Sequence, residues 1–280
     1  MSLLARCGLI GSFLAMLGSG ASAQQGAGAA LAGNPTVAPL NRAGMLLYET
    51  LKGASGVCTA QFVASNVILT AAHCVRDRET GKFFDVSKMF FGLQYQNGQA
   101  SRVFKSQCSF TVRGWVMPSV PNMTAQQKSV ALSKTWQFDY AFIVLDGRSP
   151  NGWNEVTANW KSGEWRGATA TGYPGKLLDG AVIQQKRGNL FTLQQVDIAE
   201  DPDLENVLVL WHGALDFTQG SSGGAWIGNM GSDTSKPDNN RVLSVTSFGM
   251  PNSRPGASFG PYLNDNFLNL FNLAKAGCPK

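Results

Sequence analysis

The stretch Leu69-Thr70-Ala71-Ala72-His73-Cys74 contains one of only two histidines in the 280 residues of the chain. An apolar run ends there in small residues next to a cysteine. The other histidine, His212, lies in the run Leu210-Trp211-His212-Gly213. Any mechanism that depends on an imidazole must therefore use one of these two positions.

A second motif, Gln219-Gly220-Ser221-Ser222-Gly223-Gly224, places a serine between glycines. Glycines let a tight turn expose the serine hydroxyl and let a substrate carbonyl approach the backbone N–H groups. Taken alone, such a loop is equally typical of a turn or linker. It also fits the Gly-x-Ser-x-Gly elbow of α/β-hydrolases, but those enzymes need a histidine after the serine. No histidine follows Ser222, so the order must be histidine before serine.

Short apolar runs separated by turn residues surround these motifs, and 32 residues are glycine. Runs of this length and spacing predict an all-β protein built as a sandwich or as barrels. The expected strands cover residues 56–62, 66–70, 89–93, 102–110, 140–145, 167–172, 181–188, 207–211, 225–227 and 241–248.

The C-terminal segment differs from the rest because its apolar residues recur at helical spacing. Asn264 or Asp265 can cap the start of this helix, and Gly277 follows as a stop. A single C-terminal α-helix docked on β structure is expected, whereas residues 118–135 and 228–240 are expected to be long surface loops. The apolar positions of the helix are Leu263, Phe267, Leu270, Phe271 and Ala274.

Residues 1–23 have the pattern of an export signal, with Arg6, an apolar stretch at residues 8–17 and a small-residue cleavage site at residues 21–23. The apolar stretch is too short to span a bilayer. Residues 24–44 are expected to be a mobile arm or a pro-segment. We therefore expect a secreted or periplasmic protein with no membrane association.

The formal charge of +5 comes from 23 basic and 18 acidic residues. The basic residues are scattered singly, so no nucleic-acid partner is expected. With Cys7 removed, Cys58, Cys74, Cys108 and Cys278 form an even set that predicts two disulfides in an oxidising compartment. The sequence alone leaves three possible disulfide pairings of these four cysteines open. The spacing of cysteines and histidines does not indicate a metal site, and no cofactor is implied.

Three motifs together resemble those of the trypsin-like serine peptidases, in particular their bacterial branch. They are the stretch at residues 70–74 around His73, Asp139 at the head of an apolar strand, and Gly220-Ser221-Ser222-Gly223-Gly224. They occur in the order typical of the family, and the resemblance covers roughly residue 45 to the C-terminus. Residues 172–175 also look like a turn of the bacterial branch.

The resemblance implies a chymotrypsin-like fold of two antiparallel six-stranded β-barrels, at residues 45–150 and 151–280, the second including the helix. The triad in the cleft between them would be His73, Asp139 and Ser222. The backbone N–H groups of Gly220 and Ser222 would receive the oxyanion. The family's bridge next to the histidine would be Cys58–Cys74, and Cys108–Cys278 would then be the second bridge.

Substrate-binding residues also follow from the resemblance. Ser247, Phe248 and Gly249 resemble the family's substrate-binding strand, and Ser247 is expected to hydrogen-bond Asp139. Asp216 occupies the position of the pocket acid of trypsin, and Gly249 and Gly256 match the two glycines of the pocket wall. These matches imply cleavage after Arg or Lys, although Asp216 can equally support the loop next to Ser222.

Two departures from the family limit what carries over. Glutamyl endopeptidases have a histidine where this chain has Thr246, so cleavage after Glu is disfavoured. Ser221 replaces the aspartate that pairs with a newly cut N-terminus in animal trypsins, so activation by that salt bridge is not expected.

The sequence thus predicts a monomeric serine endopeptidase that acts on protein or peptide substrates. A catalytically silent homologue that serves as a binding module is the main alternative, and an esterase with the same triad is another.

Overall fold

The computed structural model describes residues 30–118, 121–159, 167–175, 180–192, 206–213, 217, 219–231, 239–249 and 256–279. The predicted signal at residues 1–23 lies outside these ranges, and so does Asp216, the predicted pocket acid. Across the described ranges, no helix is both long and apolar enough to span a bilayer.

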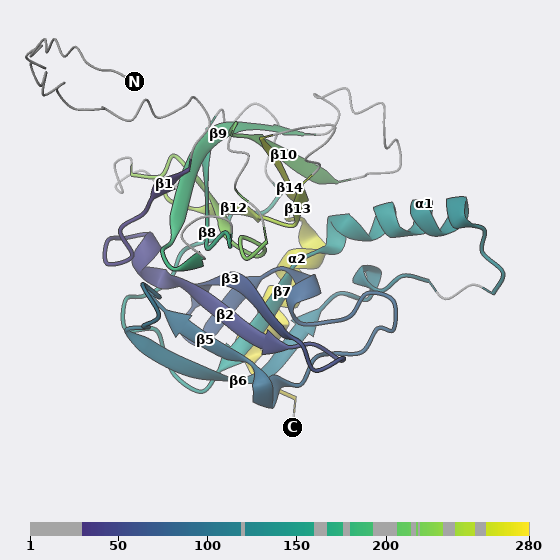
Figure 1. The fold of residues 1–280 in the computed structure, drawn as a ribbon, viewed down its shortest axis with the longest axis horizontal. Coiled ribbons are helices and arrows are strands. Elements are labelled where there is room, and N and C mark those ends of the chain that lie inside the picture. Colours follow the sequence, from purple (N-terminus) through teal and green to yellow (C-terminus); the bar gives the residue numbers. More distant parts are fainter. Residues whose placement is uncertain are drawn as a thin grey trace, which may run out of the picture.

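Six antiparallel strands of the N-terminal half close into a barrel (Figure 1). Phe62, Phe91 and Phe104 fill its interior with ring contacts at 5.3–6.2 Å. Their inward positions follow from the twofold alternation of side chains along each strand. The strands pair in the order β2-β3-β4-β7-β6-β5 and comprise β2 (Ala43–Glu49), β3 (Ser55–Ala64), β4 (Val67–Thr70), β5 (Phe90–Leu93), β6 (Arg102–Thr111) and β7 (Ala141–Leu145).

The C-terminal half is an eight-stranded sheet with the order β12-β11-β8-β9-β10-β14-β13, to which β1 adds next to β9. Among the described residues it stays open, so the prediction of a second closed barrel is only partly confirmed. Its two ends do approach, because the Ser244 hydroxyl of β12 donates to the Pro261 carbonyl of β14 at 2.7 Å. The strands are β1 (Leu31–Ala32), β8 (Ala168–Gly172), β9 (Gln184–Thr192), β10 (Val207–Trp211), β11 (Ala225–Gly228), β12 (Val242–Val245), β13 (Phe248–Gly249) and β14 (Ala257–Pro261).

The helix α2 (Asp265–Ala276) confirms the predicted C-terminal helix. Asn264 caps its start by accepting from the Asn266 amide, and Gly277 follows its end. Its apolar face packs on Phe142 of β7, with the Phe142 and Phe271 rings stacked at 5.1 Å. One buried cluster joins this face to β4, β7, β11 and β12, so α2 closes the junction between the two sheets.

Two expected segments differ in the structure. The predicted surface loop at residues 118–135 contains α1 (Ala125–Thr135), because Thr124 and Gln127 form a reciprocal capping box at its start. Residues 30–44, expected in a mobile arm, pack on the body through the pairing of β1 with β9 and through buried Leu40. The remaining short helices are η1 (Leu40–Arg42), η2 (Ala72–Cys74), η3 (Val86–Lys88), η4 (Arg113–Trp115) and η5 (Trp136–Phe138).

Both disulfides have the pairing that the family resemblance implies. Cys58 and Cys74 are joined, and so are Cys108 and Cys278. The first bridge connects β3 to the helix η2 that carries His73. The second ties β6 to the segment after α2.

Candidate active site

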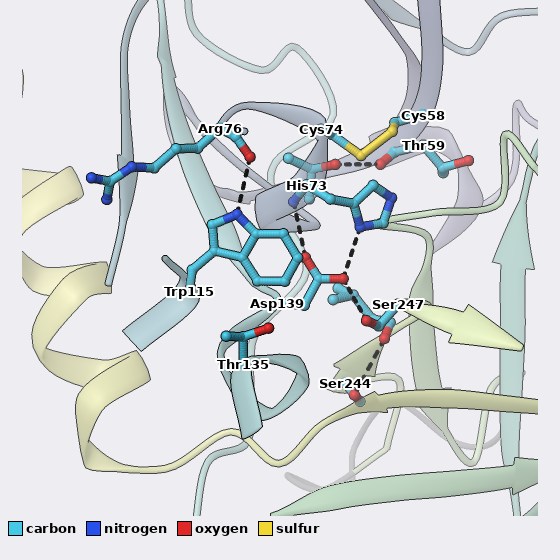
Figure 2. A network of polar contacts seen from close by, with 12 residues as sticks. Cys58, Thr59, His73, Cys74, Arg76, Trp115, Thr135, Asp139, Ser244 and Ser247 are labelled. Carbon is cyan, nitrogen blue, oxygen red and sulfur yellow. Dashed lines mark hydrogen bonds and ion pairs between the residues drawn. A yellow bond between two sulfur atoms is a disulfide. The ribbon is translucent and has the colours of Figure 1, made fainter. Parts of the chain in front are cut away.

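His73 sits in η2, directly after β4 ends. The small residues before it, Ala71 and Ala72, are fully buried, which lets the chain turn tightly into the junction of the two sheets. Two hydrogen bonds tie His73 to Asp139 (Figure 2). The His73 amide donates to Oδ1 at 2.9 Å, and ring Nδ1 lies 2.8 Å from Oδ2. The ring orientation is therefore fixed by one carboxylate.

Asp139 is fully buried, with no exposed side-chain surface. The Ser247 hydroxyl, from the second sheet, donates to its Oδ2. Burial alone would raise the pKa of Asp139. The charge of His73, with the hydrogen bonds from the His73 ring, from Ser247 and from the His73 amide, outweighs it and holds that pKa below the ordinary value. Asp139 is therefore a carboxylate at neutral pH.

The loop around Ser222 is fixed by contacts with the first barrel. Thr59 of β3 donates its amide to the Ser222 carbonyl at 2.7 Å and its hydroxyl to the Gly220 carbonyl at 2.7 Å. Gly220 has φ +94°, and a Cβ there would lie 2.2 Å from the Tyr173 carbonyl oxygen. At Gly223, with φ +79°, a Cβ would lie 2.2 Å from the Thr70 hydroxyl. The loop therefore requires glycine on both sides of Ser222.

His73 and Ser222 line one cleft of about 730 Å³. Its lining contains no Asp, Glu, Lys or Arg side chain, and it includes the side chains of Leu47, Tyr95 and Tyr173. In the described contacts, ring Nε2 of His73 makes no hydrogen bond to the Ser222 hydroxyl. Such bonds are often long in the absence of substrate and tighten when it binds.

The predicted substrate strand forms β13, which pairs with β14 through Phe248↔Phe259 and Gly249↔Ser258. Phe248 is stacked on Trp136 of η5, with ring centroids 4.4 Å apart. Gly249 is exposed, and Gly256 is buried against the backbone of residue 213. The structure thus places Ser247 against Asp139, whereas Gly249 and Gly256, which were predicted to line the pocket wall, lie opposite Ser258 and against residue 213.

His212 lies apart from this cluster, behind Gly256, whose carbonyl accepts from the His212 amide at 3.0 Å. Its Nε2 lies 2.8 Å from the Ser258 hydroxyl, and it is only 6% exposed. Burial lowers the pKa of His212 to about 4, and the charge of Lys186 adds to the shift. His212 is thus neutral at neutral pH.

Sequence reasoning missed Thr59 and Trp136. Thr59 links the two halves at the Ser222 loop, and the Tyr173 amide also donates to its hydroxyl at 3.0 Å. Its position next to Cys58 was the only signal. Trp136 connects Phe248 to Trp115, whose ring lies 6.3 Å from that of His73. It directly follows residues 118–135, which were predicted to be a loop.

Among the described residues, one group of side chains of the types that bind metal ions lies close together, and it consists of Cys58, His73 and Cys74. Both cysteines are joined in the disulfide, so neither supplies a thiolate ligand.

Comparison with known proteins identifies the family. The family model of Trypsin matches residues 42–264, so the chain belongs to the Trypsin family. No curated protein was matched in sequence.

Solved structures share the fold. A thermostable serine protease, AL20, from an extremophilic microorganism is 21% identical with a TM-score of 0.62, covering 85% of this chain and 98% of that one. A Glu endopeptidase is 22% identical with the same TM-score, covering 90% and 98%. An inactivated protease paralogue from the scabies mite is 13% identical with a TM-score of 0.59, covering 91% and 98%. These likenesses establish a chymotrypsin-type serine protease fold.

Proposed function

We propose that this protein is a secreted serine endopeptidase that uses His73, Asp139 and Ser222 as its catalytic triad. The observation that carries the proposal is the His73 ring, held by a buried carboxylate on one side and lining the same cleft as Ser222 on the other. Family membership supplies the peptidase class.

The proposed reaction begins when Ser222 Oγ attacks the scissile carbonyl. Because a neutral hydroxyl is a poor nucleophile, His73 Nε2 takes its proton and later donates it to the leaving amine. Nδ1–H of His73 donates to Asp139, which keeps the proton off Nε2 until it is needed. The Asp139 carboxylate also stabilises the imidazolium that forms. The acyl-enzyme on Ser222 is then hydrolysed by water with the same proton transfers.

The oxyanion of the tetrahedral intermediate is assigned to the amides of Gly220 and Ser222. Within the described part of the chain, neither amide donates to another protein group, while the Gly220 carbonyl is turned toward Thr59. Removing one such donor from an oxyanion hole typically slows the reaction by about 10²–10³-fold.

A catalytically silent homologue is the alternative, and one structural neighbour is described as an inactivated protease paralogue. Retention of all three triad side chains, with the His73–Asp139 pair at 2.8 Å, favours the enzyme. Labelling with a peptidyl phosphonate tests this. Wild type should carry one adduct on Ser222, and Ser222→Ala should carry none. An unlabelled wild type that is folded by circular dichroism would establish the binding module instead.

For the residue preference, we propose cleavage after Arg or Lys, with Asp216 pairing with the substrate cation. Support from this chain is indirect. Thr246, where glutamyl endopeptidases have a histidine, accepts a hydrogen bond from Trp226 Nε1 at 2.9 Å. His212 is neutral and adds no cation. Cleavage-site profiling of wild type and Asp216→Ser decides this. A preference for basic residues that disappears in the variant is expected, whereas an unchanged preference would make Asp216 a loop support.

Export and assembly complete the proposal. Two disulfides fit an oxidising compartment, and we propose a monomer that acts on protein or peptide substrates. An esterase with the same triad would hydrolyse ester substrates and leave all members of the peptide library intact.

A further inference from the structure

Between β6 and Asp139, residues 112–118 and 121–138 form a surface that the proposed mechanism does not use. Its helix α1 projects away from both sheets (Figure 1). Between α1 and the η4 side of the segment lies a groove of about 710 Å³. Its apolar lining is contributed by Val116, Pro118, Pro121, Met123, Val130 and Phe138.

The charged residues of this segment all have the same sign. Residues 112–138 contain three cations, Arg113, Lys128 and Lys134, and no Asp or Glu. All three cations are exposed, and Lys134 lines the groove. The adjoining residues 76–79 carry two cations and two acids and so add no net charge. A ligand that combines apolar side chains with carboxylates is therefore complementary to this surface.

The surface is continuous with the proposed active site. Helix α1 runs directly into η5, and Asp139 follows η5. Trp136 of η5 packs on Phe248 of β13, with ring centroids 4.4 Å apart. Among the described strands, β13 pairs only with β14, which leaves its other edge able to accept an extended peptide. Because Phe248 contacts Trp136, a peptide paired with that edge would pass next to Trp136 and could reach α1.

We propose that residues 112–118 and 121–138 form a substrate exosite, which binds an apolar and acidic segment of the protein substrate on the N-terminal side of the scissile bond. This proposal rests on the proposed peptidase function. Apolar side chains of the substrate fill the groove next to Val130 and Phe138, and its carboxylates face Lys134 and Lys128. The exosite selects among substrates that share the same residues next to the cleaved bond.

The test compares two peptides built on one cleavable sequence obtained by profiling. Each carries the same N-terminal extension of about eight residues, except that Glu and Asp in one are Gln and Asn in the other. At low salt, wild type should show a kcat/KM about fivefold or more higher on the acidic peptide. The ratio should shrink toward one at about 1 M salt, where exposed charges are screened.

Variants locate the effect. Lys128→Glu/Lys134→Glu should bring the acidic-to-neutral ratio to one or below, and Ala131→Trp, which fills the groove, should weaken both extended peptides relative to the unextended one. Lys105→Glu, an exposed lysine on β6, is the matched control and should keep the wild-type ratio. A wild-type ratio of one, or an equal loss in the Lys105 control, would overturn the exosite.

A binding measurement separates this proposal from the peptidase function. Fluorescence anisotropy of the labelled acidic peptide with Ser222→Ala reports the exosite without turnover. Binding that Lys128→Glu/Lys134→Glu abolishes supports the exosite even if no peptide is cleaved, which would contradict only the peptidase function. Cleavage of the unextended peptide with no extension-dependent binding would contradict only the exosite.

Discussion

The two histidines of this chain show how the same side chain takes opposite chemistry in the two halves of the molecule. His73 has 29% of its side chain exposed and pairs with the fully buried carboxylate of Asp139. His212 is 6% exposed and pairs with the hydroxyl of Ser258. Burial and the nearby cation of Lys186 disfavour an imidazolium at His212, whereas the His73 ring has a buried carboxylate as its hydrogen-bond partner.

This difference supports the roles proposed for the two histidines. A general base must accept a full proton during the reaction, and only His73 has a negative charge placed to stabilise that state. His73 also lines the cleft that contains Ser222, whereas His212 does not. His212 instead packs against Phe217, with ring centroids 5.6 Å apart, in the core of the second sheet.

We expect the largest difference in kcat/KM between variants in which one or the other histidine is replaced. His73→Ala should lower kcat/KM by about 10⁵–10⁶-fold, as expected when a triad acts as a unit. His212→Gln should lower it by less than about tenfold, because the residue lies outside the cleft. Steady-state kinetics on one profiled peptide measures both. An active His73→Ala, or a folded His212→Gln as inactive as that variant, would reverse the assignment.

Substitutions of the residues that hydrogen-bond the two histidines, or hold those partners, test the difference between His73 and His212 further. Asp139→Asn should slow the reaction by about 10⁴-fold, because an amide can hold the wrong tautomer of His73. Ser247→Ala removes one hydrogen bond to Asp139 and should cost only about tenfold. Ser258→Ala, the matched change behind His212, should leave kcat within about twofold. A comparable loss of kcat in all three variants would mean that the measured effect is general destabilisation.

The sequence was sufficient for the parts of the molecule that depend on local pattern. Alternating apolar runs placed most strands within a few residues, and the helical spacing from Leu263 to Ala274 predicted α2. The resemblance of three motifs to those of the trypsin-like peptidases led to the prediction that His73, Asp139 and Ser222 form a triad. The structure places His73 against Asp139 and on one cleft with Ser222.

Long-range and polar features were harder to predict. Helix α1 was missed because its exposed, polar sequence lacks an apolar stripe, although the Thr124–Gln127 capping box was readable. The approach of β12 to β14 in the second sheet depends on long-range contacts such as that of Ser244 with Pro261. The bond from Thr59 to Gly220 in the Ser222 loop joins residues 161 positions apart, and no local pattern encodes such a pair.

The two disulfides are expected to have different main effects, one on the position of His73 and the other on the free energy of unfolding. Cys58–Cys74 closes a loop next to His73 with a sequence separation of 16, and Cys108–Cys278 closes a loop with a separation of 170. Chain entropy predicts that removing them costs about 3 and about 5 kcal/mol of unfolding free energy, respectively. Cys58→Ala/Cys74→Ala should therefore destabilise less but reduce kcat more. Denaturant unfolding and kinetics on both double variants check this; a larger kcat loss in Cys108→Ala/Cys278→Ala would refute a positioning role for the first bridge.

The smallest effect comes from the protonation of His212. Its folded pKa of about 4 lies below the ordinary value of 6.5, so the unfolded chain binds the proton more tightly. The resulting stability is fully present above pH 6.5 and is lost as the pH falls toward 4, at most about 3 kcal/mol. Asp139, whose folded pKa is lowered, loses its contribution only at more acidic pH. Urea unfolding of wild type and His212→Gln between pH 7 and 4.5 isolates the contribution of His212 to the pH dependence of the unfolding free energy. The variant should show the shallower dependence, and identical slopes would mean that folding does not lower the pKa of His212.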